Sequence, residues 1–228
     1  GPVSKHLASR LRTGAILRDG PVSTIELRAG MIVGAGSESW WIVRDLALRL
    51  PVMVLPSWLR NKSEPIAIDD VIGALVRAVE QEHEGSAWYD IPGPEPLTAR
   101  QILERVAAGV GLKPLMIPVP VLSPGLSSHW LRLITRADHT VSRQLVDGLT
   151  ADLVSTGTTF WDLHPDLPRT PFDEAVRQAL AHEQPSSGLG GRLERLFVRI
   201  GGGRSPGYSE LVREPAPAPS PAGTSSAR

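Results

Sequence analysis

The sequence contains no cysteine among its 228 residues. That absence excludes disulfides, zinc–thiolate sites and a cysteine nucleophile, and it suits a reducing compartment, so we expect a cytoplasmic protein. An excess of one charge is also lacking, because 24 lysines and arginines balance 24 aspartates and glutamates. A nucleic-acid partner held by overall positive charge is therefore not expected.

Long apolar runs are missing as well. The strongest candidate, Leu46 to Leu59, is interrupted by Arg49, Pro51 and Pro56, and it falls short of the ~20 residues that cross a bilayer. We therefore expect no membrane span. The chain also does not open with a secretory signal. The six histidines show no paired metal-ligand spacing, and no metal site is expected.

The clearest pattern present lies in residues 5–36. An apolar residue recurs at every fourth position, at Leu7, Leu11 and Ala15, which predicts a helix over 5–18. The Asp-Gly pair that follows ends this helix. Apolar residues then alternate with polar ones over 24–33, which predicts a strand that ends in a glycine-rich corner.

This helix and strand resemble a segment of the short-chain dehydrogenase/reductase superfamily, in which a helix carrying Tyr-x-x-x-Lys leads to a strand reading roughly Leu-Arg-Pro-x-x-Val-Tyr-Gly. Here His6-Leu-Ala-Ser-Arg10 stands where Tyr and Lys would be, and the strand reads Leu27-Arg28-Ala29-Gly30-Met31-Ile32-Val33-Gly34. The chain is similar to the atypical, epimerase-like branch that includes NmrA-type proteins. Both members of the catalytic pair differ, so the resemblance supports the fold more strongly than the activity.

Two further phrases carry the same resemblance, which covers residues 4–180. The stretch 66–71 resembles the family's Ile-x-Val-x-Asp-Val segment, and a carboxylate of Asp69 or Asp70 is expected to cap the helix that follows. The stretch 89–98 resembles the family's Tyr-x-Ile-Gly-Gly-Pro-x-x-Leu-Thr junction. There, Thr98 and Gln101 predict a capping box.

The resemblance implies an α/β fold. We expect an incomplete Rossmann-like, doubly wound domain that lacks its N-terminal dinucleotide-binding half, with a C-terminal substrate-side helical lobe and a disordered tail. The family's glycine-rich pyrophosphate motif lies upstream of the opening helix. The glycines that follow the predicted strand, Gly34-x-Gly36, come at the wrong end of the domain for that motif. The chain also opens with Gly1 and Pro2, so we expect a piece of a longer protein. Its exposed sheet edge would pair with the upstream half or with another copy.

The resemblance also implies the site. His6 and Arg10 occupy the positions of the catalytic pair; histidine can exchange a proton near neutral pH, whereas arginine is not equivalent to lysine. Ala29, Gly30 and Ile32 lie near the nicotinamide of a bound NAD or NADP. The intact protein is expected to act on a small-molecule substrate or nucleotide with epimerase- or reductase-like chemistry, and the piece alone to be inactive. The alternative is a non-catalytic, NmrA-like module that senses nucleotides or binds a protein partner.

The chain divides into three regions. Residues 1–183 form the domain just described, 184–213 a linker with a short basic amphipathic segment, and 214–228 a disordered tail rich in proline, alanine and serine. Within 192–200 one face carries Leu193, Leu196, Phe197 and Ile200. We expect this segment to pack onto the body or onto a domain outside this chain, with docking on a membrane surface as the remaining alternative.

Other local signals predict further helices. Ser37 should cap a helix that runs to about Leu50. Trp40 and Trp41 lie in its first turn, where we expect them to fill the core, with the lining of a cleft as the alternative. Thr170 should cap a helix that ends near His182. Residues 122–135 and 139–149 are additional helix candidates.

Overall fold

The computed structural model describes residues 5–56, 60–119, 152–183 and 188–200. The helix candidates at 122–135 and 139–149 and the predicted tail at 214–228 lie outside these residues. The described elements follow one another as α1 Lys5–Arg18, β1 Ile25–Arg28, β2 Ile32–Val33, α2 Glu38–Arg49, β3 Val52–Pro56, β4 Lys62–Ser63, β5 Ile66–Ala67, α3 Ile68–Glu80, β6 Ala87–Asp90, β7 Leu97–Thr98, α4 Ala99–Gly109, β8 Leu115–Val119, α7 Phe160–Leu163, α8 Phe172–Ala181 and α9 Gly188–Ile200.

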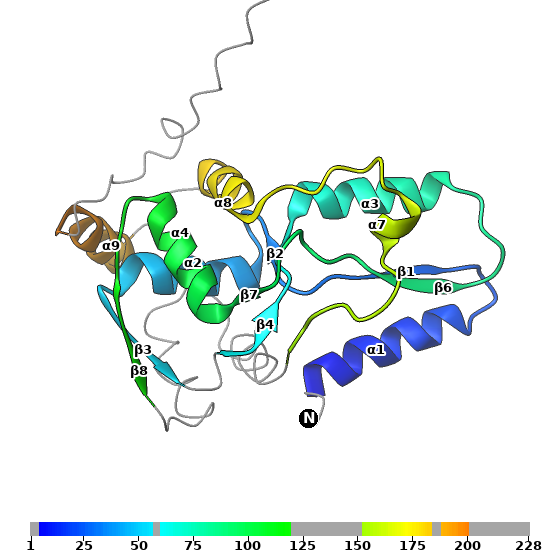
Figure 1. The fold of residues 1–228 in the computed structure, drawn as a ribbon, viewed down its shortest axis with the longest axis horizontal. Helices are drawn as coiled ribbons and strands as arrows, with labels where there is room; N and C mark the ends of the chain where they lie inside the picture. Colours follow the sequence, from blue (N-terminus) through cyan, green and yellow to red (C-terminus); the bar gives the residue numbers. More distant parts are fainter. Residues whose placement is uncertain (1–4, 57–59, 120–151, 184–187, 201–228) are drawn as a thin grey trace, which may run out of the picture.

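The first part of the fold is a three-layer unit. β1 and β6 pair in parallel, in a register that runs from Ile25 opposite Ala87 to Arg28 opposite Asp90. α3 lies on one face of this pair and α1 on the other (Figure 1). Parallel strands between two helical layers confirm the predicted α/β class. Within the described residues the sheet stops at β1, which pairs with β6 alone.

The strand predicted over 24–33 is divided in two. β1 pairs with β6, whereas β2 pairs in parallel with β5, with Ile32 opposite Ile66. The change of partner explains the break: Ile91 N donates to Arg28 O and Ile66 N donates to Met31 O, both at 2.9 Å. The chain therefore bends over residues 29–31, where no strand is formed.

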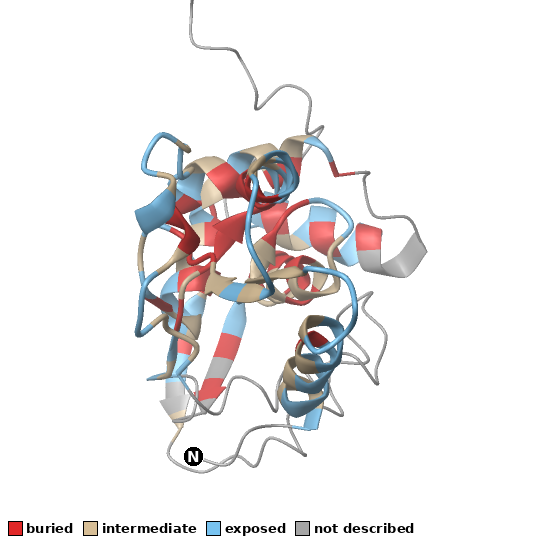
Figure 2. Cartoon of the chain, turned by 90° about the vertical axis from the view of Figure 1, so that its right-hand side faces the viewer, coloured by how far each residue is buried: buried red, intermediate tan, exposed pale blue. Residues whose placement is uncertain are grey.

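The second part of the fold contains α2, α4, α8 and α9 beside the parallel pair β3–β8 (Figure 1). Two hydrophobic clusters correspond to the two parts, and the buried residues gather in the interior between the layers (Figure 2). The larger cluster joins α2, α4, α8 and the strand pair and includes Trp40, Leu48, Met53, Val106, Phe172 and Val198. The smaller lies between β1, β6, α3 and α7 and includes Ile66, Ala74, Ile91 and Phe160.

Several predicted local signals are confirmed. α1 spans the predicted residues 5–18. Ser37 caps α2, since its hydroxyl accepts from Trp40 N at 3.1 Å, and Trp40 is fully buried. Thr98 and Gln101 form the predicted capping box at the start of α4.

The predicted caps of α3 and α8 are wrong. α3 begins at Ile68 after an Ala67 N-cap, and α8 begins after a Pro171 N-cap; neither has a side-chain cap. The carboxylate of Asp70 instead accepts from the backbone nitrogen of Thr170 at 2.7 Å and from its hydroxyl at 2.8 Å. The two residues satisfy each other across 100 positions of sequence, which a local pattern does not reveal.

α9 also departs from the sequence prediction. It begins at Gly188, inside the segment expected to be a linker, and it packs on the body through Gly191, Glu194 and Val198. The apolar face predicted to be buried is largely exposed, at Leu193, Leu196 and Ile200. α9 therefore packs on the rest of the protein, which was one of the predicted alternatives, but it does so through the face opposite to the predicted one.

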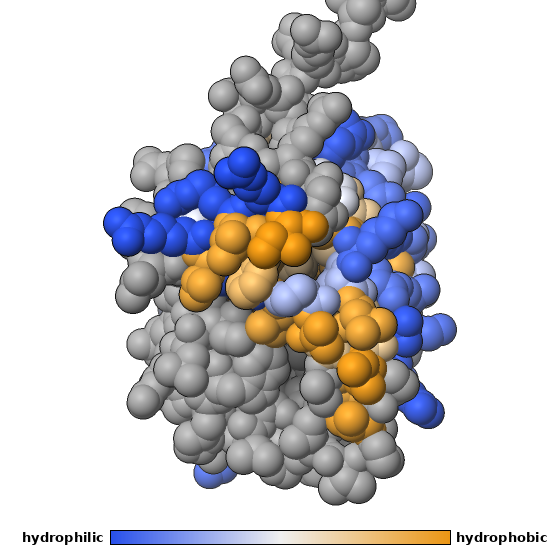
Figure 3. All heavy atoms as spheres, turned by 90° about the vertical axis from the view of Figure 1, so that its left-hand side faces the viewer, coloured by the Kyte–Doolittle hydropathy of each residue, from blue (hydrophilic) through white to orange (hydrophobic). Residues whose placement is uncertain are grey.

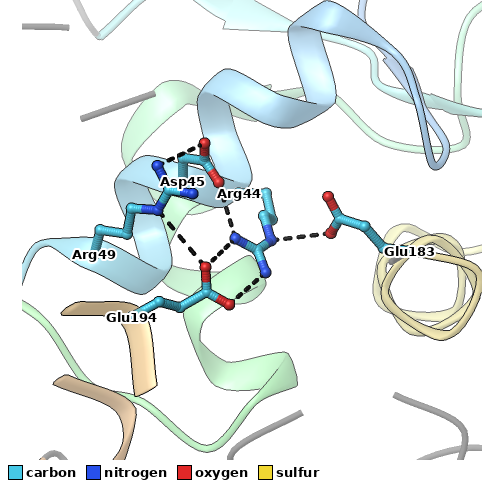
Figure 4. A network of polar contacts seen from close by, with 5 residues as sticks. All are labelled: Arg44, Asp45, Arg49, Glu183 and Glu194. Carbon is cyan, nitrogen blue, oxygen red and sulfur yellow. Dashed lines mark hydrogen bonds and ion pairs between the residues drawn. The ribbon is translucent and has the colours of Figure 1, made fainter. Parts of the chain in front are cut away.

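A buried ionic cluster accounts for this orientation (Figure 4). Arg44 of α2 is fully buried, and its two terminal nitrogens donate to the two carboxylate oxygens of Glu194, each at 2.5 Å. Its Nε donates to Glu183 at 2.9 Å, and its Nη1 also donates to Asp45 at 2.9 Å. Arg49 adds ion pairs to Asp45 at 3.1 Å and to Glu194 at 3.6 Å. Buried charges require such partners, so Glu194 faces inward.

We expect Arg44→Met to destabilise the protein by about 3–5 kcal/mol, because it leaves several carboxylates buried without the guanidinium. The thermal midpoint should fall by roughly 10 °C for a chain of this size. Arg192→Met, on the exposed side of α9, is the matched control and should change stability by less than about 0.5 kcal/mol. Equal losses in the two variants, measured by thermal melts, would contradict a structural role for the cluster.

Candidate functional site

The candidate site lies at the carboxyl ends of β1 and β6. In open parallel α/β sheets, ligands bind outside the carboxyl ends of the strands. β1 ends at Arg28 and β6 at Asp90, which face each other in register. Of the predicted cofactor-binding residues, Ala29 and Gly30 directly follow β1, and Ile32 opens β2. The structure thus brings all three to one edge of the sheet.

The predicted catalytic pair lies on α1. This helix runs back along the sheet in the direction opposite to β1, so its first turns lie at the end where β1 stops (Figure 1). His6 is half-buried and Arg10 is exposed, and their spacing places them on one side of the helix. α1 and β1 approach closely at Gly14, where an added Cβ would collide with the Glu26 carboxylate. His6 and Arg10 belong to the first two turns of α1, at the end of the helix toward which β1 runs (Figure 1); their proximity to Ala29 and Gly30 and their roles stay predictions.

A polar row covers the face of the sheet that α1 approaches. Glu26 forms ion pairs with Arg18 and with Arg28, the latter at 2.9 Å. The guanidinium carbon of Arg28 lies 3.8 Å from the ring centroid of Trp88, an attractive cation–π arrangement. Arg28 is therefore held in place at the carboxyl end of β1 by a carboxylate and an indole ring.

Two carboxylates stand next to this row. The pKa of the Asp90 carboxyl is raised, mainly by burial and also by the charge of Glu64, while Arg28 acts in the opposite direction. Glu64 is fixed by Ser155, whose backbone nitrogen and hydroxyl donate to its carboxylate at 2.8 and 2.9 Å. A carboxyl with a raised pKa at a strand end is suited to exchanging protons.

The chain leaving β6 is closely supported. Gly93 N donates to Glu64 O at 3.1 Å, and a Cβ at Gly93 would collide with the carbonyl oxygen of Pro65. From the other side, Trp161 Nε1 donates to Pro92 O at 2.7 Å. The loop after β6 therefore lies between two elements that fix its path and allow no side chain at position 93.

Sequence reasoning missed Arg28, Glu64 and Asp90 as members of this site. A usable signal existed for two of them, because Arg28 and Asp90 are charged residues at the last position of a parallel strand. Glu64 gave no such signal, since its position depends on the distant Ser155. Trp161, whose indole fixes the adjacent loop, was not identified either.

In the part of the chain that the structure describes, no three histidine, acidic or cysteine side chains converge on a point where a metal ion could be held. No helix of these same residues combines the length and apolar character needed to cross a bilayer.

Comparisons with known proteins give a partial likeness of fold. No family model and no curated protein matches the sequence. Among solved structures, the UDP-glucose 4-epimerase of Thermus thermophilus, in complex with NAD, matches at 21% identity over 63% of this chain and 51% of its own, with a TM-score of 0.39. RMD from Pseudomonas aeruginosa, complexed with NADPH, matches at 13% identity over 78% and 58%, with a TM-score of 0.47.

The UDP-N-acetylglucosamine 4-epimerase from Bacillus cereus matches at 17% identity over 72% of this chain and 55% of its own, with a TM-score of 0.41. Identities this low concern the fold alone. The chain spans about half the length of the solved structures that it matches.

The raised pKa of Asp90 predicts that this carboxyl lowers the stability of the folded state in a pH-dependent way. Folded Asp90 keeps its proton above the ordinary value of 3.8, so the folded state loses stability as pH rises from about 4 through the raised pKa. We therefore expect Asp90→Asn to raise the thermal midpoint at about pH 7, and the gain to disappear at about pH 3. Asp19→Asn, in the exposed turn after α1, is the control. A gain independent of pH would show that the carboxyl's charge is not the cause.

Proposed function

We propose that the chain supplies the C-terminal half of an NAD(P)-binding domain of the short-chain dehydrogenase/reductase type, and that an upstream half completes the cofactor site. The observation that carries this proposal is the outer surface of α3. Its inner face is buried against the sheet, yet its outer face is also apolar and between 40% and 86% exposed, at Ile68, Ile72, Leu75, Val76 and Val79. A contiguous exposed apolar surface of this kind marks a site of contact with another part of a protein.

The edge of the sheet supports the same proposal. Parallel sheets occur with both faces covered and with strands on either side. The outer edge of β6 is occupied where Asp90 bridges Thr159, whereas β1 has no second partner within the described residues. A further strand, leading into α1, would add beside β1, and an upstream helix on the same face of the sheet as α3 would lie beside α3. One upstream unit would therefore cover both exposed surfaces.

The cofactor and the chemistry follow from the resemblance. The nicotinamide, when bound, would supply hydride transfer beside Ala29, Gly30 and Ile32. The upstream half would hold the pyrophosphate, because the glycines between β2 and α2, Gly34 and Gly36, do not form the family's Gly-x-x-Gly-x-x-Gly motif. His6 would pass a proton to or from an oxygen of a small-molecule or sugar-nucleotide substrate, and Arg10 would provide positive charge one turn away. The absence of cysteine favours a cytoplasmic location.

A second candidate function is a non-catalytic, NmrA-like module that senses nucleotides or contacts a protein. One observation favours it: the chain has two tyrosines, Tyr89 and Tyr208, and neither is followed by lysine four residues later. The Tyr-x-x-x-Lys pair of the family is therefore absent from this sequence. Turnover by the completed protein would exclude this reading.

A thermal melt with and without NADH or NADPH tests the division of the cofactor site. A ligand at ~100 times its dissociation constant stabilises by ~2.7 kcal/mol, a shift of roughly 5–10 °C for a domain of this size. We expect no such shift for the 228-residue chain alone, and a shift once the upstream half is restored. A shift for the chain alone would contradict the proposal, because the chain would then contain a complete dinucleotide-binding site.

Turnover by the completed protein tests His6. We expect His6→Ala to lower kcat by about 100-fold or more, the usual contribution of a positioned general acid or base. Arg12→Ala changes an exposed residue of the same helix and should leave kcat unchanged. Absorbance of the reduced nicotinamide measures both. Undiminished turnover by His6→Ala would place the proton transfer elsewhere.

A further inference from the structure

The exposed side of α9 combines two chemically distinct stripes. Leu193, Leu196 and Ile200 follow one another at intervals of three and four residues, and so do Arg192, Arg195 and Arg199, each one residue earlier. All six side chains are exposed. Since residues at these intervals share a side of a helix, an aliphatic stripe runs next to a stripe of arginines.

The buried ionic cluster around Arg44 determines which side of α9 faces outward. Glu194 is the single acidic residue of α9, and both its carboxylate oxygens accept from Arg44 at 2.5 Å. Val198 is buried beside it in the core. Turning the helix to bury its leucines would remove Glu194 from Arg44 and leave buried charges without their partners. The aliphatic and basic stripes are thus held outward.

The parallel pair β3–β8 extends the aliphatic surface. Val52, Leu115 and Ile117 are exposed on these strands, and with the three apolar residues of α9 they range from 42% to 72% exposed. Figure 3 shows the two apolar areas on one face of the molecule, with hydrophilic side chains along the outer border of the upper area. We call this surface, formed by Val52, Leu115, Ile117, Leu193, Leu196 and Ile200 with the three arginines, the α9 face.

We propose that the α9 face docks on the surface of a membrane that contains anionic lipids. An interfacial helix lies in the plane of the membrane with apolar side chains at the acyl boundary and arginines among the headgroups. The α9 face has this composition, and its charge is complementary to anionic headgroups. Contiguous exposed apolar patches mark interaction sites. Docking of this kind requires no spanning helix, and it is independent of the proposed cofactor site.

Other occupants fit the chemistry less well. A two-fold contact between copies of the chain places the same patch against itself, which brings the arginine stripes of the two α9 helices toward each other. Charge therefore favours an anionic lipid surface over a second copy of the chain.

Co-sedimentation of the full chain with vesicles tests the proposal. We expect binding to phosphatidylcholine vesicles that contain phosphatidylserine, no comparable binding to phosphatidylcholine alone, and weakening as salt is added. Arg192→Gln with Arg199→Gln should lower the partition coefficient about 25-fold, or about 5-fold for each arginine. Arg12→Gln with Arg169→Gln removes the same charge from exposed positions elsewhere and should bind like the wild type.

The apolar part is tested in the same way. Leu196→Asp should lower partition at least about 10-fold, whereas Val22→Asp, in an exposed turn after α1, should not. Circular dichroism shows whether each variant keeps its fold; both positions are exposed, so both should. Absent binding, equal binding to the two kinds of vesicle, or equal loss in the control variants would overturn the proposal. So would a dimer, seen by light scattering, that Leu196→Asp abolishes, because a second copy would then cover the face.

Discussion

The guanidinium of Arg44 joins three helices in the interior of this protein. It belongs to α2 and binds carboxylates from α9 and from the end of α8, so its burial is compatible only with the present arrangement of all three. Apolar packing alone would favour a different orientation of α9, with its leucines inward. The ionic cluster outweighs that preference. Leaving a buried charge without its partner costs more free energy than burying a few aliphatic side chains of α9 would gain.

The two parts of the fold differ in how completely their apolar surface is covered. Around Trp40 and Phe172 the larger cluster is enclosed by helices and by β3–β8. Around β1 and β6 the smaller cluster has cover on its inner side, while the outer surface of α3 remains apolar and exposed. The candidate site lies in this less complete part, which is where an additional strand and helix would also contribute groups to a ligand.

Local signals in the sequence were sufficient where structure depends on near neighbours. The period of α1, the Ser37 cap and the Thr98–Gln101 box involve residues within four positions, and each was predicted correctly. Asp70 and Thr170 were misjudged because they bind each other instead of their own helices. The buried side of α9 was misjudged because Glu194 binds Arg44 across 150 positions. The available hint was the presence of Arg44, Asp45 and Arg49 among residues 40–50, whose other members are all apolar. For the site, Arg28 and Asp90 carried a signal as charged residues at strand ends, whereas the position of Glu64 depends on the distant Ser155 and required the tertiary structure.

The division of the predicted strand into β1 and β2 has a mechanical consequence. One continuous stretch of chain is paired with β6 on one side of residues 29–31 and with β5 on the other, so it belongs to both hydrophobic clusters. A rotation of one part against the other would pivot about this stretch, because it is anchored in each. In a rotation about residues 29–31, the displacement of a residue increases with its distance from this stretch. Ala29 and Gly30 would keep their positions during such a rotation, while residues farther from this stretch would move through larger arcs.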